Sequence, residues 1–171
     1  FPRGELIVYT EGRQPADREE FRSSLRGEPM NVPVAVLINS GSASAAEIVA
    51  GALKDTKRAV IVGERSFGKG SVQSIFRLKD GEALRLTTAR YYTPGGVTIH
   101  EQGVAPDVEI VMSPEDDRKL AIQRARDDIT DPEEFEQRFG FAPIVDRQLQ
   151  LAQQVLQTAL LIDERLVTAA R

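Results

Sequence analysis

A short, fully apolar run limits the folds open to this chain more than any other feature. The run is VAVLI, residues 34–38, and its length is that of a single strand. Apolar residues on both faces of a strand are typical of a parallel sheet that is covered on both sides. Small residues (NSGSAS) end the run, and from about Ser44 apolar residues recur at helical spacing. This strand–turn–helix unit predicts a mixed α/β domain.

The other elements expected before residue 113 are short strands, because their residues are largely β-branched or aromatic. Asp80 and Gly81 lie between two of these strands and favour a hairpin turn. The polar stretch 10–29 is rich in turn formers and predicts a surface loop. The expected strands are residues 6–9, 59–62, 71–78, 83–93, 97–99 and 108–112.

From Ser113 onward the sequence has a helical pattern. Ser113 is a suitable N-cap, and Pro114 is favourable in the first turn of a helix. Residues 131–139 predict a second short helix, and residues 145–171 predict an amphipathic helical tail. We therefore expect an α/β part over residues 1–112 and a helical part over residues 113–171. The helical part is suited to dimerisation, to a regulatory partner or to closure of the core.

The glycine-rich stretch VIVGERSFGKGSVQ surrounds a lysine that allows two interpretations. Read from Gly63 to Gly68 and Lys69, it nearly matches a phosphate-binding loop. That motif needs a hydroxyl directly after the lysine, a helix after the loop and an acidic residue at the end of another buried strand. Here Gly70 follows the lysine, the next residues have a strand pattern, and the apolar run 34–38 ends at an asparagine. Nucleotide binding is therefore the least favoured function.

The second interpretation of Lys69 is a general base that takes a proton from a serine. A turn between a strand and a helix can present a nucleophile beside free helix N–H groups, which stabilise an oxyanion. The residue pattern does not choose among Ser40, Ser42 and Ser44. A lysine base must be neutral at working pH, which burial away from water favours. The glycines and Phe67 lead us to expect water-poor packing around this amine.

Four ordered blocks resemble the C-terminal processing peptidases, also called tail-specific proteases. The blocks are VAVLINSGSASAAEIVAGALKD, AVIVGERSFGKGSVQ, LRLTTARYYTPGG and GVAPDVEI. The resemblance covers residues 6–110, and four matches in order make it specific. It implies a serine endopeptidase that hydrolyses peptide bonds with a Ser–Lys pair, through an acyl-enzyme. It also implies a crotonase-like fold related to the Clp protease.

The resemblance assigns roles to individual residues. The serine of SASAAE is the family's nucleophile, which is Ser44 here, and the lysine of FGKG is its general base, Lys69. Gln73 corresponds to the glutamine that orients the lysine, and the backbone N–H of Ala45 is one oxyanion donor. The spacing between Ser44 and Lys69 also matches the family. The turn formers expected near this site are Gly41, Gly68 and Gly70.

Two parts of the family pattern are absent from these residues. They are the PDZ domain, which recognises the substrate's C-terminus, and the upstream Asn-Pro-Gly-Gly type segment, which supplies the second oxyanion donor. The chain also begins FPRGELIVYT, without Met or a leader. We therefore expect a piece of a longer protein, which is compatible with a folded but inactive fragment. By the family resemblance alone, the whole protein is expected to be exported to the bacterial periplasm or the outer face of a membrane.

Composition restricts the partners. The chain has no cysteine, which excludes disulfides, thiolate metal sites and a cysteine nucleophile, and we expect neither a metal nor a cofactor. The formal charge is −4 and no basic run stands out, which argues against a nucleic-acid partner. The expected partners are unfolded polypeptides or exposed C-termini, with a homo-oligomer or a regulatory protein on the helical part. A non-catalytic peptide-binding or scaffolding protein is the alternative.

Some residues have simpler interpretations. Glu47 reads as an acid in the first turn of a helix, where the helix dipole favours it. His100 suggests a Ser–His–Asp triad with Asp107 or Asp131, but it lies beside EQG in an expected turn, where a lone histidine is usually solvated. We therefore expect no catalytic role for His100. Gln73, by its strand position alone, would be a surface residue.

Overall fold

A computed structural model describes residues 1–169 of the chain, with the backbone alone for Pro15 and residues 163–169. Most elements as far as β7 are strands, with helix α1 among them, and helices follow. The elements are β1 (Leu6–Glu11), the 3₁₀ turn η1 (Pro15–Asp17), β2 (Glu19–Arg22), β3 (Ala35–Ile38), α1 (Ala45–Asp55), β4 (Val60–Gly63), β5 (Ser71–Arg77), the 3₁₀ turn η2 (Lys79–Gly81), β6 (Ala83–Tyr92), β7 (Val108–Glu109), α2 (Pro114–Ala125), α3 (Pro132–Phe139) and α4 (Arg147–Ala169). The expected mixed α/β architecture is confirmed.

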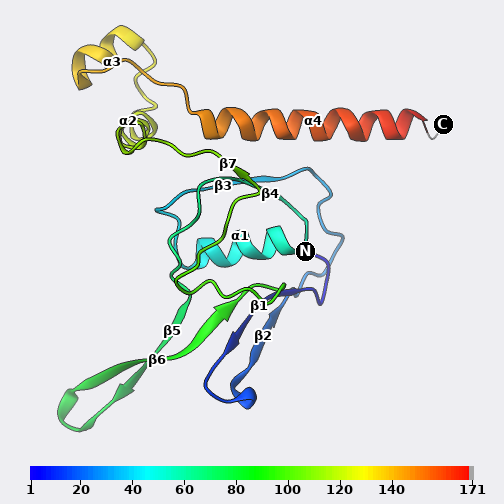
Figure 1. Ribbon diagram of the computed structural model, residues 1–171, viewed down its shortest axis with the longest axis vertical. Helices are drawn as coiled ribbons and strands as arrows, with labels where there is room; N and C mark the ends of the chain where they lie inside the picture. The colour runs from blue at the N-terminus through cyan, green and yellow to red at the C-terminus, as the bar shows by residue number, and fades with distance from the viewer. Residues whose placement is uncertain (170–171) are drawn as a thin grey trace.

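The apolar run forms β3 of a small parallel sheet with strand order β3-β4-β7. Ala35 pairs with Val60 and Ile38 with Gly63, so β3 and β4 are in register along their whole length. Helix α1 contacts β4 from one side, and α4 contacts β3 and β4 (Figure 1). The covered parallel strands expected from the apolar run are thus present.

The second sheet is antiparallel, with strand order β2-β1-β6-β5. Strands β5 and β6 form the expected hairpin, which extends away from the helices and the parallel sheet in Figure 1. Asp80 and Gly81 have positive φ values of 69° and 83° in the connection. Such φ values are those that the Asp-Gly pair tolerates in a hairpin turn.

Helix α1 lies between the two sheets, and the core of the molecule surrounds it (Figure 1). On the side of the parallel sheet, Ala50 packs with Ile38, Ile61 and Val104, all of them buried. On the other side α1 contacts β1 of the antiparallel sheet. The helix is therefore held between two layers.

The loop expected over residues 10–29 contains a strand that sequence patterning did not predict. β1 extends to Glu11, and β2 pairs with it in antiparallel orientation. All four residues of β2 are exposed. An exposed edge strand has no buried face and therefore lacks the alternation of apolar residues by which strands are predicted.

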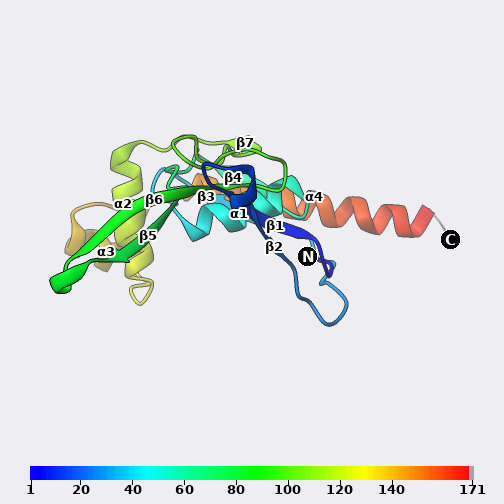
Figure 2. The ribbon, with the colours of Figure 1, turned by 90° about the horizontal axis from the view of Figure 1, so that it is seen from below.

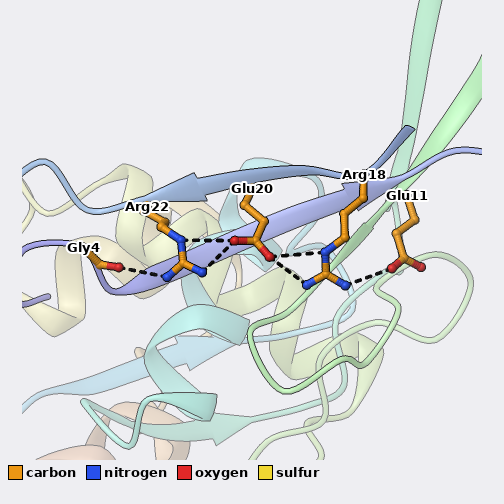
Figure 3. A network of polar contacts seen from close by, with 5 residues as sticks. All are labelled: Gly4, Glu11, Arg18, Glu20 and Arg22. Atoms are coloured by element: carbon orange, nitrogen blue, oxygen red, sulfur yellow. Dashed lines mark hydrogen bonds and ion pairs between the residues drawn. The ribbon is translucent and has the colours of Figure 1, made fainter. Parts of the chain in front are cut away.

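Charged side chains form a network of ion pairs along strands β1 and β2 (Figure 3). Arg18 bonds Glu11 at 3.1 Å and Glu20 at 2.9 Å, and its guanidinium lies 3.8 Å from the ring centroid of Tyr9. Arg22 bonds the other oxygen of Glu20 at 2.6 Å. The hydrogen bonds from Arg22 and then Arg18 lower the pKa of Glu20 below its usual value. This network is exposed, so each of its ion pairs adds little to stability.

Two expected strands are shorter than the sequence suggests. Residues 97–99 form only an isolated bridge, between Tyr92 and Thr98. In place of a strand over residues 108–112, β7 has two residues, which pair with the last two residues of β4. The pairing ends because β4 itself ends at Gly63, and Met112 N–H donates instead to Glu64 Oε1 at 2.7 Å.

The helical part follows the sequence expectation closely. Ser113 Oγ accepts a hydrogen bond from Asp116 N–H at 3.0 Å and caps α2. The buried Gln148 donates to Ile110 O at 2.9 Å and attaches the start of α4 beside β7. The other end of α4 extends beyond the sheets in both views (Figures 1 and 2). Over residues 1–169, no helix combines the length and the apolar character that crossing a membrane requires.

Candidate active site

The chain reaches Ser44 through a tight turn after β3. Gly41 N–H donates to Asn39 Oδ1 at 3.0 Å, and Ser42 N–H donates to Asn39 O at 2.9 Å. Ser42 Oγ in turn accepts from Asn39 N–H at 3.1 Å. Ser42 is therefore a turn residue, and its hydroxyl oxygen is already bonded to the backbone of Asn39. The small residues allow the chain to reverse before α1 begins.

Ser44 is the N-cap of α1 and has a strained backbone, with φ 61° and ψ −123°. A non-glycine residue in such a conformation costs of order 1–3 kcal/mol and persists where its surroundings hold it in place. In α/β-hydrolases, the nucleophilic serine is exposed by a strained strand-to-helix turn of this kind. Ser44 is exposed, and the N–H of Ala45 has no hydrogen-bond partner among the residues that the structure describes.

The loop that carries Lys69 alternates between buried and exposed residues. Ser66, Gly68 and Gly70 are buried, whereas Phe67 and Lys69 are exposed, Phe67 by 68%. The expectation of water-poor packing around the lysine amine is therefore wrong in this structure. An extended segment points alternate side chains to opposite sides, so burying the glycines turns Phe67 and Lys69 outward.

Gln73 lies on β5 and is exposed. The register between β5 and β6 shifts between Val72 and Gln73, and such irregularities turn a strand's side chains to new directions. Within residues 1–169, no hydrogen bond joins the Lys69 amine to the Ser44 hydroxyl or to the Gln73 side chain. The three predicted catalytic side chains are all exposed, and no hydrogen bond joins them in the part of the chain that the structure describes.

A residue that sequence reasoning treated as a helix acid connects the serine turn to the lysine loop. Glu47 is fully buried, and its Oε2 accepts hydrogen bonds from the N–H groups of Ser44 and Lys69, each at 2.8 Å. Its Oε1 accepts from Ser66 Oγ at 2.5 Å and from Gly68 N–H at 2.6 Å. The Ser-x-x-Glu spacing signals the contact with Ser44 as a capping box. No local pattern signals the contacts with the loop.

The alternative sites are not assembled. Asp107 binds Lys54 at 3.0 Å and Ile61 N–H at 2.9 Å, and Asp131 caps α3 by accepting from Glu133 N–H at 2.9 Å. Both carboxylates that could complete a triad with His100 are therefore occupied. The residues after Gly70 form strand β5, whereas a phosphate-binding loop leads into a helix.

Known proteins resemble this chain mainly in its α/β part. The sequence model of peptidase family S41 matches residues 1–110. A carboxy-terminal-processing protease of Bartonella bacilliformis is 54% identical over 104 residues, which are 61% of this chain and 24% of that protein. A carboxyl-terminal-processing protease of Synechocystis is 49% identical over 109 residues, 63% of this chain and 25% of that protein. The chain thus spans about a quarter of the length of these relatives.

Solved structures agree with the sequence comparison. A photosystem II D1 C-terminal processing protease has a TM-score of 0.58 and 41% identity, covering 63% of this chain and 28% of that one. An S41 protease structure from Bacteroides fragilis has a TM-score of 0.55 over 94% of this chain and 38% of its own, and at 17% identity it supports the fold alone. Since the family model covers more than half of the residues and C-terminal processing proteases share up to 54% identity with them, the chain belongs to peptidase family S41.

Proposed function

We propose that the chain carries the catalytic residues of a C-terminal processing serine endopeptidase with a Ser–Lys dyad. The observation that carries the proposal is the strained and exposed Ser44 at the start of α1, whose N–H shares one acceptor oxygen with the N–H of Lys69. The similarity to proteins named C-terminal processing proteases supports the choice of reaction.

In the proposed mechanism, the neutral amine of Lys69 takes the proton from Ser44 Oγ as this oxygen attacks a peptide carbonyl carbon. Ala45 N–H, which has no partner among the described residues, is free to bind the oxyanion. Lys69 then gives the proton to the leaving amine. Water, deprotonated by Lys69, hydrolyses the acyl-enzyme and restores the serine. Gln73 orients the lysine, and a segment outside these residues supplies the second oxyanion donor.

The side chains must move for this reaction, because Lys69 and Ser44 share no side-chain hydrogen bond within the described residues. Catalytic hydrogen bonds are often long or poorly aligned without substrate and shorten in the substrate complex. Glu47 holds the backbone of Lys69 in place. The movement that brings the amine to Ser44 is therefore a rotation of the exposed lysine side chain.

The finer features of the fold belong to the same proposal. We assign a crotonase/Clp-protease-like core to residues 1–112 and a separate helical region to residues 113–171. The end of the family match at residue 110 and the start of α2 at Pro114 support this division. The substrates are unfolded or extended polypeptides with accessible C-termini, which pair with a sheet edge as an added strand. Oligomerisation or a regulatory partner is assigned to the helical region.

The compartment is also a proposal. The relatives come from bacteria and from chloroplasts. We assign the whole protein to an exported bacterial location, the periplasm or the outer face of a membrane. Detection of the full-length protein in the periplasmic fraction of cells, with a cytoplasmic marker absent from that fraction, tests this assignment.

The test of the dyad is cleavage of an unstructured protein by the full-length gene product that contains this chain. Ser44→Ala and Lys69→Ala should each lower kcat/KM by at least about 10³-fold while the protein stays folded, because each removes a group that the covalent step needs. Ser40→Ala and Lys79→Ala are matched controls at exposed positions and should retain activity.

Two other outcomes of this experiment would change the assignment. An inactive Ser40→Ala beside an active Ser44→Ala would move the nucleophile to Ser40. A wild-type protein that does not cleave would favour the non-catalytic peptide-binding alternative. The exposed Lys69 amine, which has no hydrogen-bond partner among the described residues, is compatible with that alternative.

A further inference from the structure

Glu47 is a buried carboxylate without a cationic partner. Its side chain is fully buried, and no ion pair involves it within residues 1–169. Burial of a carboxylate is costly unless hydrogen bonds replace its lost hydration. The donors to Glu47 are the N–H groups of Ser44, Gly68 and Lys69 and the hydroxyl of Ser66. They match the acceptor sites of a carboxylate, which is acceptor-only.

These donors come from two segments that lie far apart in the sequence. Ser44 precedes the helix that carries Glu47, whereas Gly68 and Lys69 belong to the loop after β4. Ser66 extends the network to a third segment, because its Oγ also accepts from Val104 N–H at 2.7 Å. One side chain thus joins the start of α1 to the lysine loop and, through Ser66, to the segment before β7.

The two oxygens of Glu47 have different tasks. Oε1 holds the buried part of the loop through Ser66 and Gly68, whereas Oε2 binds the two residues proposed to react, Ser44 and Lys69. The next donor along the chain, Ala45 N–H, has no hydrogen-bond partner among the residues that the structure describes. Movement of Oε2 would therefore shift the serine and the lysine backbones together.

We infer that Glu47 is a positioning residue, which holds Ser44 in its strained conformation and sets the distance between the serine and lysine backbones. The inference rests on the proposed function, because the two backbones matter for catalysis only if their side chains react. In this role, the hydrogen bond from Ser44 N–H to Glu47 maintains the strained conformation of Ser44. Glu47 itself touches neither the substrate nor the reacting atoms.

Glu47→Gln tests this role with little change in side-chain shape. Glutamine replaces one acceptor oxygen by an NH₂ donor. If the NH₂ group occupies the Oε2 position, it faces the N–H groups of Ser44 and Lys69. If the amide is flipped, it faces Gly68 N–H. Either orientation leaves a backbone donor opposite another donor and displaces one end of the link.

The experiment compares kcat and KM of the full-length protein and its Glu47→Gln variant with an unstructured protein substrate. We expect kcat to fall by about 10²-fold, since small displacements of reacting groups have effects of this size. KM should stay near its wild-type value, because Glu47 does not contact substrate. The control is Asp107→Asn, which removes another carboxylate that accepts a backbone N–H and should lower the melting temperature without changing kcat.

A second measurement remains decisive if Glu47→Gln does not fold. Amide hydrogen exchange in the wild-type protein should show protected N–H groups at Ser44 and Lys69, although both residues are exposed. Exchange at the rate of an open loop would overturn the link. Unchanged kcat in a folded Glu47→Gln would overturn the catalytic role while Ser44→Ala remains inactive, which leaves the proposed function intact. A wild type that cleaves nothing would overturn the proposed function and the positioning role together.

Discussion

Ser44 combines the start of a helix with a backbone conformation that a serine does not adopt without support. Its φ of 61° is allowed at little cost only for glycine, yet the position needs a side chain if it carries the nucleophile. The Ser44 N–H bond to Glu47 and the turn before it supply the support. At the scale of single residues, strain and exposure therefore coincide at the position that the family resemblance selects.

At Gly70, the loop that carries Lys69 passes very close to the backbone of another segment. A Cβ on Gly70 would clash with the backbone N of His100 and would lie 2.8 Å from the carbonyl carbon of Ile99. Gly70→Ala should therefore push the loop away from this segment and lower the stability of the protein by about 1–3 kcal/mol. Activity should fall too, because Lys69 precedes the displaced residue. Thermal unfolding and a cleavage assay measure the two effects.

Gly27→Ala is the matched control for this prediction. A Cβ on Gly27 would have no heavy atom within 4 Å, so this variant should unfold at the wild-type temperature. A Gly70→Ala variant as stable and active as Gly27→Ala would show that the loop does not depend on this close approach.

At the scale of elements, an ion pair between Arg124 and Asp146 joins the last turn of α2 to the start of α4. Partial burial on its own raises the pKa of Asp146. The hydrogen bonds from Arg124 and from Leu149 N–H outweigh this effect, so the pKa lies below its usual value. A carboxylate with a lowered pKa stabilises the folded state above its unfolded pKa, and the stabilisation disappears as the pH falls through the folded pKa.

Asp146→Asn should therefore destabilise the protein by about 1 kcal/mol at neutral pH. The difference from wild type should shrink as the pH falls below about 4, the usual range of an aspartate pKa. Urea unfolding at neutral and acidic pH measures it. Asp128→Asn, in the exposed pair with Arg126, is the control and should have no measurable effect on stability. A constant difference at every pH would mean that the charge of Asp146 is not what matters.

The elements also differ in how far the sequence predicted them. Helices α2 and α3 follow directly from local features, since Ser113 and Asp131 cap them and a proline occupies the first turn of each. Strand β2 escaped prediction because its stabilising contacts are with β1 and with charged side chains rather than with the core. The alternation of apolar residues predicts a strand only where one face of the strand is buried, and β2 has no buried face.

At the scale of the whole molecule, α1 must fit between two sheets, and Gly51 makes room for it. A Cβ on Gly51 would lie 2.6 Å from Cγ2 of the buried Thr93, which follows β6 of the antiparallel sheet. In an exposed helix, Gly→Ala gains about 1 kcal/mol. Here overpacking between layers costs about 1–3 kcal/mol and should exceed that gain. Gly51→Ala should therefore lower the melting temperature, and an increase would contradict the close packing of α1 against this sheet.

The sequence alone determined the mixed α/β class, the helical part after Ser113, the β5–β6 hairpin and the family. These features depend on local signals: an apolar run, caps, an Asp-Gly turn and ordered motifs. The choice of Ser44, Lys69 and Gln73 also came from motifs and stays a prediction. By contrast, residue patterns predicted a water-poor environment for Lys69, whereas this side chain is exposed.

Only the tertiary structure revealed what joins the two halves of the candidate site. The four donors around Glu47 come from segments that meet because α1 and the loop after β4 leave the same small sheet side by side. A sequence pattern reports which side chains share a face of one element, but it does not report which backbone N–H groups of another element will meet them. Glu47 therefore read as a helix acid until the fold brought the lysine loop against it.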